Sequence, residues 1–184
     1  MRLSGVLEDL PPYPFARLRA TVDALRARGV EILDFGMGEP REQTPAFVRE
    51  ALAGAVEPMA PYPVTGGLPE LRDAITAWID RRFGVTVDAV IPTLGTKEVI
   101  FSLASIVEGA VGVPSPSYPV YARGAQFAGR EVVELPLLAE RGFLVDLDAV
   151  PWDRIGLLWL NYPNNPTAAV APLAFYERAA QLAR

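Results

Sequence analysis

Residue types that carry much of enzyme chemistry are missing, or nearly so, from this 184-residue chain. It has no cysteine and no histidine, and Lys97 is the one lysine among its 17 basic residues. The lack of cysteine excludes a disulfide framework and a thiolate nucleophile. The lack of histidine excludes an imidazole base, and the two absences together exclude the usual zinc sites. Any reaction that needs a lysine amine from this chain can use only Lys97.

The chain also lacks a long hydrophobic run and a cluster of charge of one sign. No window approaches the ~20 apolar residues that a membrane-spanning helix needs, and the first residues lack the apolar region of a signal peptide. We therefore expect a cytoplasmic protein that does not enter a membrane. Its formal net charge is −5, with acidic and basic residues interspersed, so nucleic acid is not an expected partner.

What the chain does have is ample apolar material in alternating helical and strand-like patterns. Hydrophobic residues make up 51% of a length that is typical of one domain. This alternation predicts an α/β fold, a mostly parallel sheet with helices on both faces. Helical spacing follows Phe15, Thr44-Pro45, Pro69, Gly95, Tyr121 and Pro172, and strand-like runs cover 31–35, 85–92, 109–113, 131–135 and 155–160.

The site prediction starts from residues 160–167, Leu-Asn-Tyr-Pro-Asn-Asn-Pro-Thr. This segment follows the apolar run of 155–160, and its two prolines stop any ladder or helix. The asparagine side chains are therefore presented on a stiffened turn at the carboxyl end of a strand, where ligands of open α/β sheets bind. The alternative is a connecting loop whose asparagines only cap backbone groups.

A glycine-led turn opens the helix after Gly95. The first N–H groups of such a helix lack partners and point outward, so hydrogen bonds and the helix dipole both favour an anion there. Many similar turns bind nothing. Two other loops allow the same pair of readings. Residues 36–40 carry glycines that let backbone approach a ligand or simply turn the chain, and residues 114–121 hold Tyr118 between prolines, as a stacking platform or as a packed loop residue.

Together these motifs resemble the fold-type I, class I and II aminotransferases, which use pyridoxal 5′-phosphate. Asn165-Pro166-Thr167 is similar to the Asn-Pro-Thr-Gly signature of that family, with Ala168 in place of its glycine. Residues 95–97 resemble its phosphate cup, and 116–121 resemble the loop whose tyrosine stacks on the cofactor. Residues 62–72 match a Tyr-x-x-x-x-Gly-x-x-x-Leu-Arg block, and 36–40 match the Gly-x-Gly-x-Pro loop of the substrate site.

The resemblance implies a role for each matching residue. Tyr118 would stack on the cofactor ring with Tyr121 in support, and Asn165 would donate to the phenolic oxygen of the cofactor. The backbone of Gly38 would lie against the substrate's α-carboxylate, and Tyr62 would reach the phosphate bound by a neighbouring subunit. The predicted cofactor-binding residues are Gly95, Thr96, Lys97, Tyr118, Asn165 and Tyr62, and the predicted substrate-binding residues are Gly38 and Asn165.

No catalytic residue is assigned to this chain by the resemblance. Members of the family are roughly twice as long, and beyond the Asn-Pro-Thr segment they carry an aspartate, a tyrosine, the lysine that binds the cofactor covalently and an arginine. Lys97 is not expected to be that lysine, because a residue in the first turn of the phosphate helix lies beside the phosphate and away from the aldehyde. Its amide and its charge suit the phosphate instead.

Residues 95–98, 123–129 and 159–166 look most like the N-succinyl-LL-diaminopimelate aminotransferases of lysine biosynthesis, which take an amino group from glutamate. The resemblance further implies that residues 1–40 contribute to a small domain and the substrate loop, and that 41–184 form part of the cofactor-binding large domain.

Two hypotheses follow for the chain as a whole. In the first it is the amino-terminal part of an aminotransferase for small amino and keto acids, active only with the remaining polypeptide, and its expected partner is a second copy in a homodimer or a companion carboxyl-terminal half. In the second it is an inactive remnant that serves as a binding module. A phosphate-ligand binder unrelated to pyridoxal 5′-phosphate is a distant third reading.

Overall fold

The computed structural model of the protein describes residues 5–8, 14–36, 38, 40, 42–56 and 61–184. The chain divides into two units, Met1–Leu68 and Pro69–Arg184. None of the helices in the described part of the chain is long and apolar enough to cross a membrane. The division into small-domain and large-domain segments after residue 40 refers to a complete enzyme, and it stays a prediction.

The described residues of the first unit include the helices α1 (Gly5–Glu8), α2 (Pro14–Ala27) and α3 (Ala46–Gly54). Helix α2 confirms the prediction from Phe15 onward. Helix α3 begins later than predicted, because Pro45 is its N-cap, with an extended ψ of 143°. The predicted strand at 31–35 is wrong, since this segment is described and forms no strand. Met37 and Glu39 of the predicted substrate loop lie outside the described residues.

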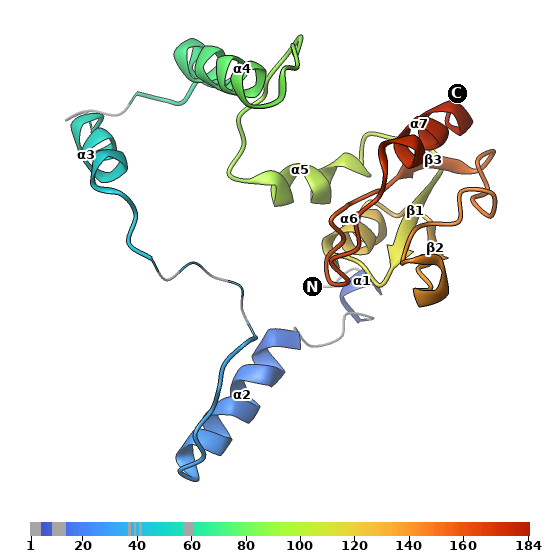
Figure 1. Ribbon diagram of the computed structural model, residues 1–184, viewed down its shortest axis with the longest axis horizontal. Coiled ribbons are helices and arrows are strands. Elements are labelled where there is room, and N and C mark those ends of the chain that lie inside the picture. The colour runs from blue at the N-terminus through green and yellow to red at the C-terminus, as the bar shows by residue number, and fades with distance from the viewer. Residues whose placement is uncertain (1–4, 9–13, 37, 39, 41, 57–60) are drawn as a thin grey trace. The chain divides into compact units, whose positions relative to one another are not determined.

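The second unit contains the helices and strands around the predicted cofactor site (Figure 1). Its predicted helices are all present, but the strand expected at 85–92 is not formed in this described segment. The elements in chain order are α4 (Pro69–Phe83), α5 (Thr96–Leu103), β1 (Ala110–Ser115), α6 (Val120–Phe127), β2 (Val132–Pro136), the short 3-10 helix η1 (Ala139–Arg141), β3 (Ile155–Leu158) and α7 (Leu173–Leu182).

The three strands form a parallel sheet in the order β2-β1-β3, which confirms the predicted parallel α/β arrangement. In the central strand β1, Val111 pairs with Val132 of β2, and Gly112 pairs with Leu158 of β3. The register shifts between Ala110 and Val111 on the β3 side. From β1 the chain passes to β2 at one edge and then crosses to β3 at the other, so the strand order reverses at the boundary between β1 and β3.

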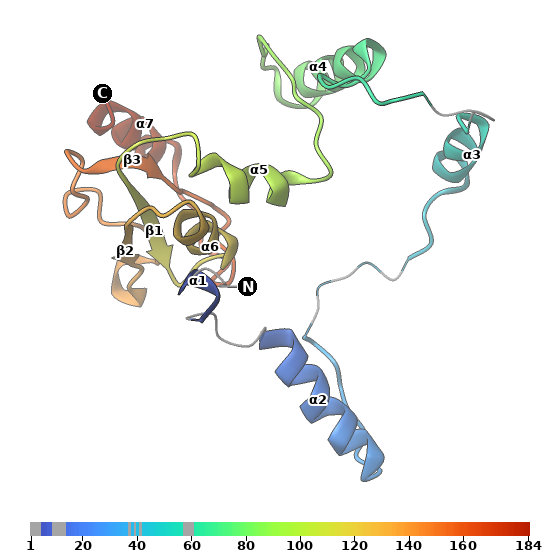
Figure 2. The same cartoon turned by 180° about the vertical axis from the view of Figure 1, so that it is seen from behind.

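Apolar side chains cover both faces of this sheet. On one face Val111 and Val113 of β1 pack with Tyr121 and Ala125 of α6 and with Ala104, directly after α5. On the other face Leu135 packs in a cluster with residues of the long β2–β3 connection and with α7: Leu137, Val145, Leu147, Val150 and Ala179. Figures 1 and 2 show α6 and α7 flanking the strands from two opposite views.

Helices α5 and α6 approach each other closely at Gly124. A Cβ atom at this position would lie 2.5 Å from the carbonyl oxygen of Phe101, so only glycine fits without displacing the backbone. The rings of Phe101 and Phe127 lie beside this contact, with centroids 5.4 Å apart. This packing fixes α5, and therefore its amino-terminal turn, against the helix that follows Tyr118.

Candidate functional site

The predicted site lies at the carboxyl ends of β1 and β3. The loop after β1 carries Tyr118, and the segment after β3 carries Asn164 and Asn165. Because the strand order reverses between β1 and β3, these two segments emerge side by side at the switch point of the sheet. In open α/β sheets this crevice is where ligands bind.

A side-chain hydrogen bond joins the two segments. The Nδ2 atom of Asn164 donates to the carbonyl oxygen of Pro116, at 3.3 Å, and to Oγ1 of Thr167, at 2.9 Å. Asn164 is 4% exposed, and it is the one residue in the polar or charged class that is buried among those described. Asn165 follows it directly and is exposed. The predicted ligand-facing asparagine is thus held next to a buried one.

The turn at Gly95 has the geometry of the predicted phosphate cup. Gly95 is the N-cap of α5 with φ of 93°, a backbone conformation that glycine adopts readily and other residues rarely do. No side chain caps the helix, so the first-turn N–H groups of Thr96 and Lys97 have no acceptor within α5. Glu98 turns back and accepts a hydrogen bond from the N–H of Leu94 at 3.1 Å. The cup therefore offers donors to an anion.

The side chain of Lys97 connects this turn with the ring of Tyr118. Its Nζ atom lies 5.9 Å from the ring centroid, within the range of a cation–π contact. A cation and an aromatic face in that relation suit a ligand with an anionic group at one end and a flat ring at the other.

Tyr118 is the first of three aromatic rings that pack in a row, Tyr118, Tyr121 and Trp159. Its ring meets that of Tyr121 edge to face, with centroids 5.8 Å apart, and Tyr121 stacks on Trp159 at 4.8 Å. Burial raises the pKa of the Tyr121 hydroxyl, and the nearby Tyr118 adds to the rise. Tyr121 thus packs as a neutral ring between Tyr118 and Trp159.

The structure thus brings together the predicted residues of the second unit, while the two other predicted residues belong to the first unit. Lys97 is in contact with Tyr118, and Asn165 lies one residue from the link to the Tyr118 loop. Gly38 and Tyr62 belong to the first unit, where Tyr62 is 97% exposed, and their roles stay predictions.

Sequence reasoning missed Asn164 and Trp159. The sequence of two asparagines between prolines does not indicate which asparagine is buried. The presence of a second asparagine beside Asn165 is the one feature of the sequence that points to Asn164. Trp159 belongs to the apolar run of 155–160, which predicts only a strand. Its indole Nε1 is buried without a hydrogen-bond partner in the described part of the chain. Its ring stacks on Tyr121 and is the last of the three rings in the row.

The donor set of this site fits pyridoxal 5′-phosphate. First-turn amides and the Lys97 ammonium match a phosphate, the Tyr118 ring matches a planar pyridine, and the exposed carboxamide of Asn165 can donate to a ring oxygen. The residues that would hold the cofactor in this chain are therefore the same five that were predicted for the second unit: Gly95, Thr96, Lys97, Tyr118 and Asn165.

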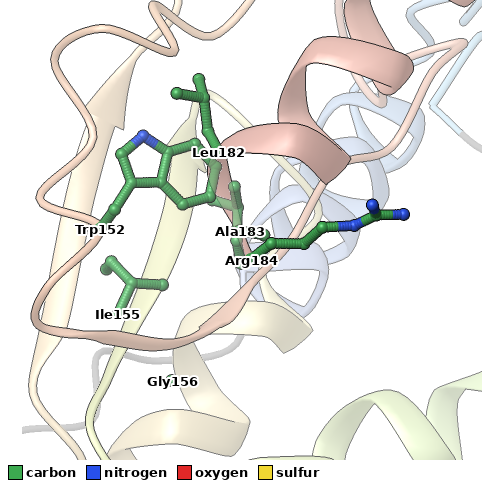
Figure 3. Close-up of a pocket in the computed structure, with 7 residues that line it drawn as sticks. Trp152, Ile155, Gly156, Leu182, Ala183 and Arg184 are labelled. Carbon is green, nitrogen blue, oxygen red and sulfur yellow. The ribbon is translucent and has the colours of Figure 1, made fainter.

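A separate pocket of about 300 Å³ lies where β3 begins and α7 ends. Figure 3 shows, among the residues that line it, Trp152 close to Leu182, Ile155 below Trp152 and the Arg184 side chain extending away. None of the predicted site residues lines this pocket. It borders β3, which is an edge strand of the described sheet.

Comparison with known proteins gives one consistent family. The family model described as aminotransferase class I and II matches residues 30–184. An LL-diaminopimelate aminotransferase of Dehalococcoides mccartyi is 43% identical over an alignment that covers 100% of this chain and 50% of the relative. One of Nitratidesulfovibrio vulgaris is 44% identical with the same coverage. The chain therefore spans about half the length of the curated relatives it matches.

Solved structures give the same result for the fold. BacF of Bacillus subtilis, in a substrate-bound structure, matches with a TM-score of 0.85 at 32% identity, covering 100% of this chain and 49% of that one. Aspartate aminotransferase of Thermus thermophilus with maleate matches with a TM-score of 0.82 at 35% identity, covering 100% and 50%. The α/β prediction and the family prediction are confirmed, while the relatives named here are LL-diaminopimelate aminotransferases with no N-succinyl in their names.

Proposed function

The chain belongs to the class I and II aminotransferases, a family that depends on pyridoxal 5′-phosphate, and from that premise we propose that it is the amino-terminal half of a diaminopimelate aminotransferase. The enzyme would move an amino group between glutamate and the keto acid of a diaminopimelate, in the cytoplasm. The observation that carries the proposal is the meeting of Lys97 with Tyr118 beside the Asn164–Pro116 link, at the switch point of the sheet.

Each residue of the second unit has a task in this proposal. When bound, the cofactor supplies a ring that withdraws electrons from the substrate's α-carbon. The amides of Thr96 and Lys97 bind its phosphate with the Lys97 ammonium, and Tyr118 packs on the ring and fixes its plane. Asn165 donates a hydrogen bond to the ring oxygen and so stabilises the anionic form of that oxygen.

Two substrates are candidates, and different observations favour them. The names of the relatives favour LL-diaminopimelate. The motif resemblance of residues 95–98, 123–129 and 159–166 favours its N-succinyl derivative, in which one amino group is acylated and neutral. The derivative lacks one positive charge and carries the additional carboxylate of the succinyl group, so the two compounds differ by two units of net charge and an assay with both separates them.

The proposal requires further polypeptide that carries the covalent lysine. Lys97 is the only lysine of the chain, and it lies beside the cup, against Tyr118. A companion carboxyl-terminal half, assembled as part of a homodimer, would supply the remaining groups. The alternative function is an inactive binding module, which would bind the cofactor without turnover.

A fusion protein tests the proposal. The chain is joined to the carboxyl-terminal half of the Dehalococcoides mccartyi relative, and glutamate formation from 2-oxoglutarate is measured with LL-diaminopimelate or its N-succinyl derivative as donor. We expect turnover by the fusion and none by the chain alone or by a control fusion whose covalent lysine is alanine.

Borohydride reduction of the chain with pyridoxal 5′-phosphate should leave the mass of the Lys97 peptide unchanged. A fusion that is folded but binds no cofactor would overturn the proposal, and one that binds cofactor without turnover would favour the binding module.

A further inference from the structure

The most tightly held polar side chain of the site is one that contacts no ligand in the proposed function. Asn164 is buried, and burying a carboxamide is unfavourable unless its hydrogen-bonding atoms find partners. Its Nδ2 has two hydrogen-bond acceptors, the Pro116 carbonyl at 3.3 Å and Thr167 Oγ1 at 2.9 Å. Pro116 is distant in sequence but lies only two residues before Tyr118.

The backbone around Asn164 closes a compact turn. Its N–H donates to the carbonyl of Ala169 at 2.8 Å, and its own carbonyl accepts from the N–H of Ala168 at 2.7 Å. Oγ1 of Thr167 also accepts from the N–H of Ala169 at 3.3 Å. The turn of 164–169 is therefore internally bonded, and Asn165 sits at its exposed tip. Because Asn164 is held in place, the backbone position from which the Asn165 side chain extends is held as well.

One side chain thus sets the distance between two loops whose tips are proposed to hold one flat ring. If the loops separate by a fraction of an ångström, the Tyr118 ring and the Asn165 carboxamide no longer fit the same plane, and such misplacement is costly in a binding site. The cup at Gly95 belongs to a different segment, held by the packing of α5 on α6 at Gly124. Loss of the link should therefore affect ring binding and spare phosphate binding.

We propose that Asn164 is a positioning residue that ties the Tyr118 loop to the Asn165 turn and so sets the geometry in which the cofactor ring is held. This inference rests on the proposed function for the identity of the ring. The link itself is a property of the chain without cofactor.

The test compares Asn164→Ala with Asn161→Ala, a matched removal of a carboxamide in the same segment. It uses the fusion protein and three readouts: affinity for pyridoxal 5′-phosphate, affinity for inorganic phosphate, and amide NMR signals of residues 117–121 without cofactor. We expect Asn164→Ala to weaken pyridoxal 5′-phosphate binding about tenfold, because one buried hydrogen-bonding group is lost. The affinity for inorganic phosphate should stay within about twofold of the wild-type value. The amide signal of Tyr118 should shift or broaden. Asn161→Ala should change none of the three.

A second pair of variants keeps the test decisive if Asn164→Ala does not fold. Thr167→Val removes the hydroxyl that accepts from Asn164 at nearly constant shape, and Thr167→Ser retains it. We expect the valine variant to reproduce the loss of ring affinity and the serine variant to keep the wild-type affinity. Equal weakening of ring and phosphate binding, or an unchanged Tyr118 amide signal, would overturn the inference. A wild-type fusion that binds phosphate but no pyridoxal 5′-phosphate would instead overturn the proposed function, and the NMR comparison would still decide whether the link exists.

Discussion

The indole of Trp159 stacks on the ring of Tyr121, with centroids 4.8 Å apart and planes inclined by 18°. Trp159 directly follows β3, and Tyr121 lies in the first turn of α6, so the stack connects the strand end that leads to Asn165 with the helix that follows Tyr118. Tyr121 in turn meets Tyr118 edge to face. The position of the proposed stacking ring thus depends on a buried ring that touches no ligand.

Removing the Tyr121 ring should destabilise the second unit strongly. Tyr121 is 5% exposed and belongs to the cluster of Val111 and Ala125, so Tyr121→Ala leaves a cavity and should lower the free energy of unfolding by about 3–5 kcal/mol. Tyr121→Phe keeps the ring and serves as the control, with a loss of under about 1.5 kcal/mol. Urea unfolding followed by circular dichroism measures both. Equal losses for the two variants would mean that the ring does not carry the packing.

The sequence predicted the helices of this chain better than its strands, and the reason is physical. Helices α2, α4 and α7 satisfy their backbone within the segment, so apolar spacing and terminal glycines or prolines are enough to locate them. A strand needs a partner. The segments 31–35 and 85–92 have strand-like patterns, but no ladder forms on them among the described residues, while 110–115 and 155–158 pair with each other.

Adding a methyl group at Gly124 should push α5 away from α6. The added Cβ would lie 2.5 Å from the Phe101 carbonyl oxygen, and relieving that contact requires a backbone shift. We expect Gly124→Ala to cost roughly 1–3 kcal/mol, as overpacking does. Gly54→Ala is the matched control, because a Cβ there meets nothing within 4 Å and the change should be neutral or slightly stabilising. Thermal unfolding of the two variants decides, and a Gly124→Ala protein as stable as the control would contradict the close approach.

The site was predictable from sequence only where one residue carries a recognisable motif. Gly95 and Lys97 share one short pattern, and Tyr118 and Asn165 each stand in another. Asn164 and Trp159 act through contacts with residues about 40 to 50 positions away, Pro116 and Tyr121, and no local pattern reports such pairs. The two missed residues are therefore those that hold the site together.

High pH should destabilise the protein through Tyr162. Its hydroxyl accepts a hydrogen bond from the Val145 N–H and donates to the Phe143 carbonyl, and burial raises its pKa above the ordinary value of 10.0. The neutral form is therefore favoured in the folded state. The stability from this shift is fully present below pH 10 and is lost as the pH rises through the higher folded-state pKa.

A comparison with Tyr162→Phe isolates this effect. The variant loses the hydrogen bonds and should be less stable at neutral pH by about 1–3 kcal/mol, because the Val145 N–H loses its acceptor. Its stability should also fall less steeply than that of the wild type above pH 10. Urea midpoints measured from pH 8 upward show the difference. Parallel curves for the two proteins would mean that Tyr162 does not carry the alkaline loss.

Replacing Ala168 with glycine should stabilise the turn that carries Asn165. Ala168 has φ of 58°, a left-handed conformation that costs a residue with a Cβ about 1–2 kcal/mol, and the signature that this segment resembles has glycine there. The N–H of Ala168 donates to the Asn164 carbonyl at 2.7 Å, and glycine keeps that bond. Greater freedom of glycine in the unfolded chain offsets part of the gain, so we expect Ala168→Gly to raise the free energy of unfolding by roughly 0.5–1 kcal/mol.

The same substitution one residue later is the control for that prediction. Ala169 also sits in the hydrogen-bonded turn, but its φ is not positive, so Ala169→Gly relieves no strain and should lower stability by roughly 0.5–1 kcal/mol. We therefore expect urea unfolding to show a higher free energy of unfolding for Ala168→Gly and a lower one for Ala169→Gly, because the two positions differ in backbone conformation. If both variants lose stability, the left-handed turn at Ala168 is not strained, and the alanine in place of the family's glycine has no energetic cost.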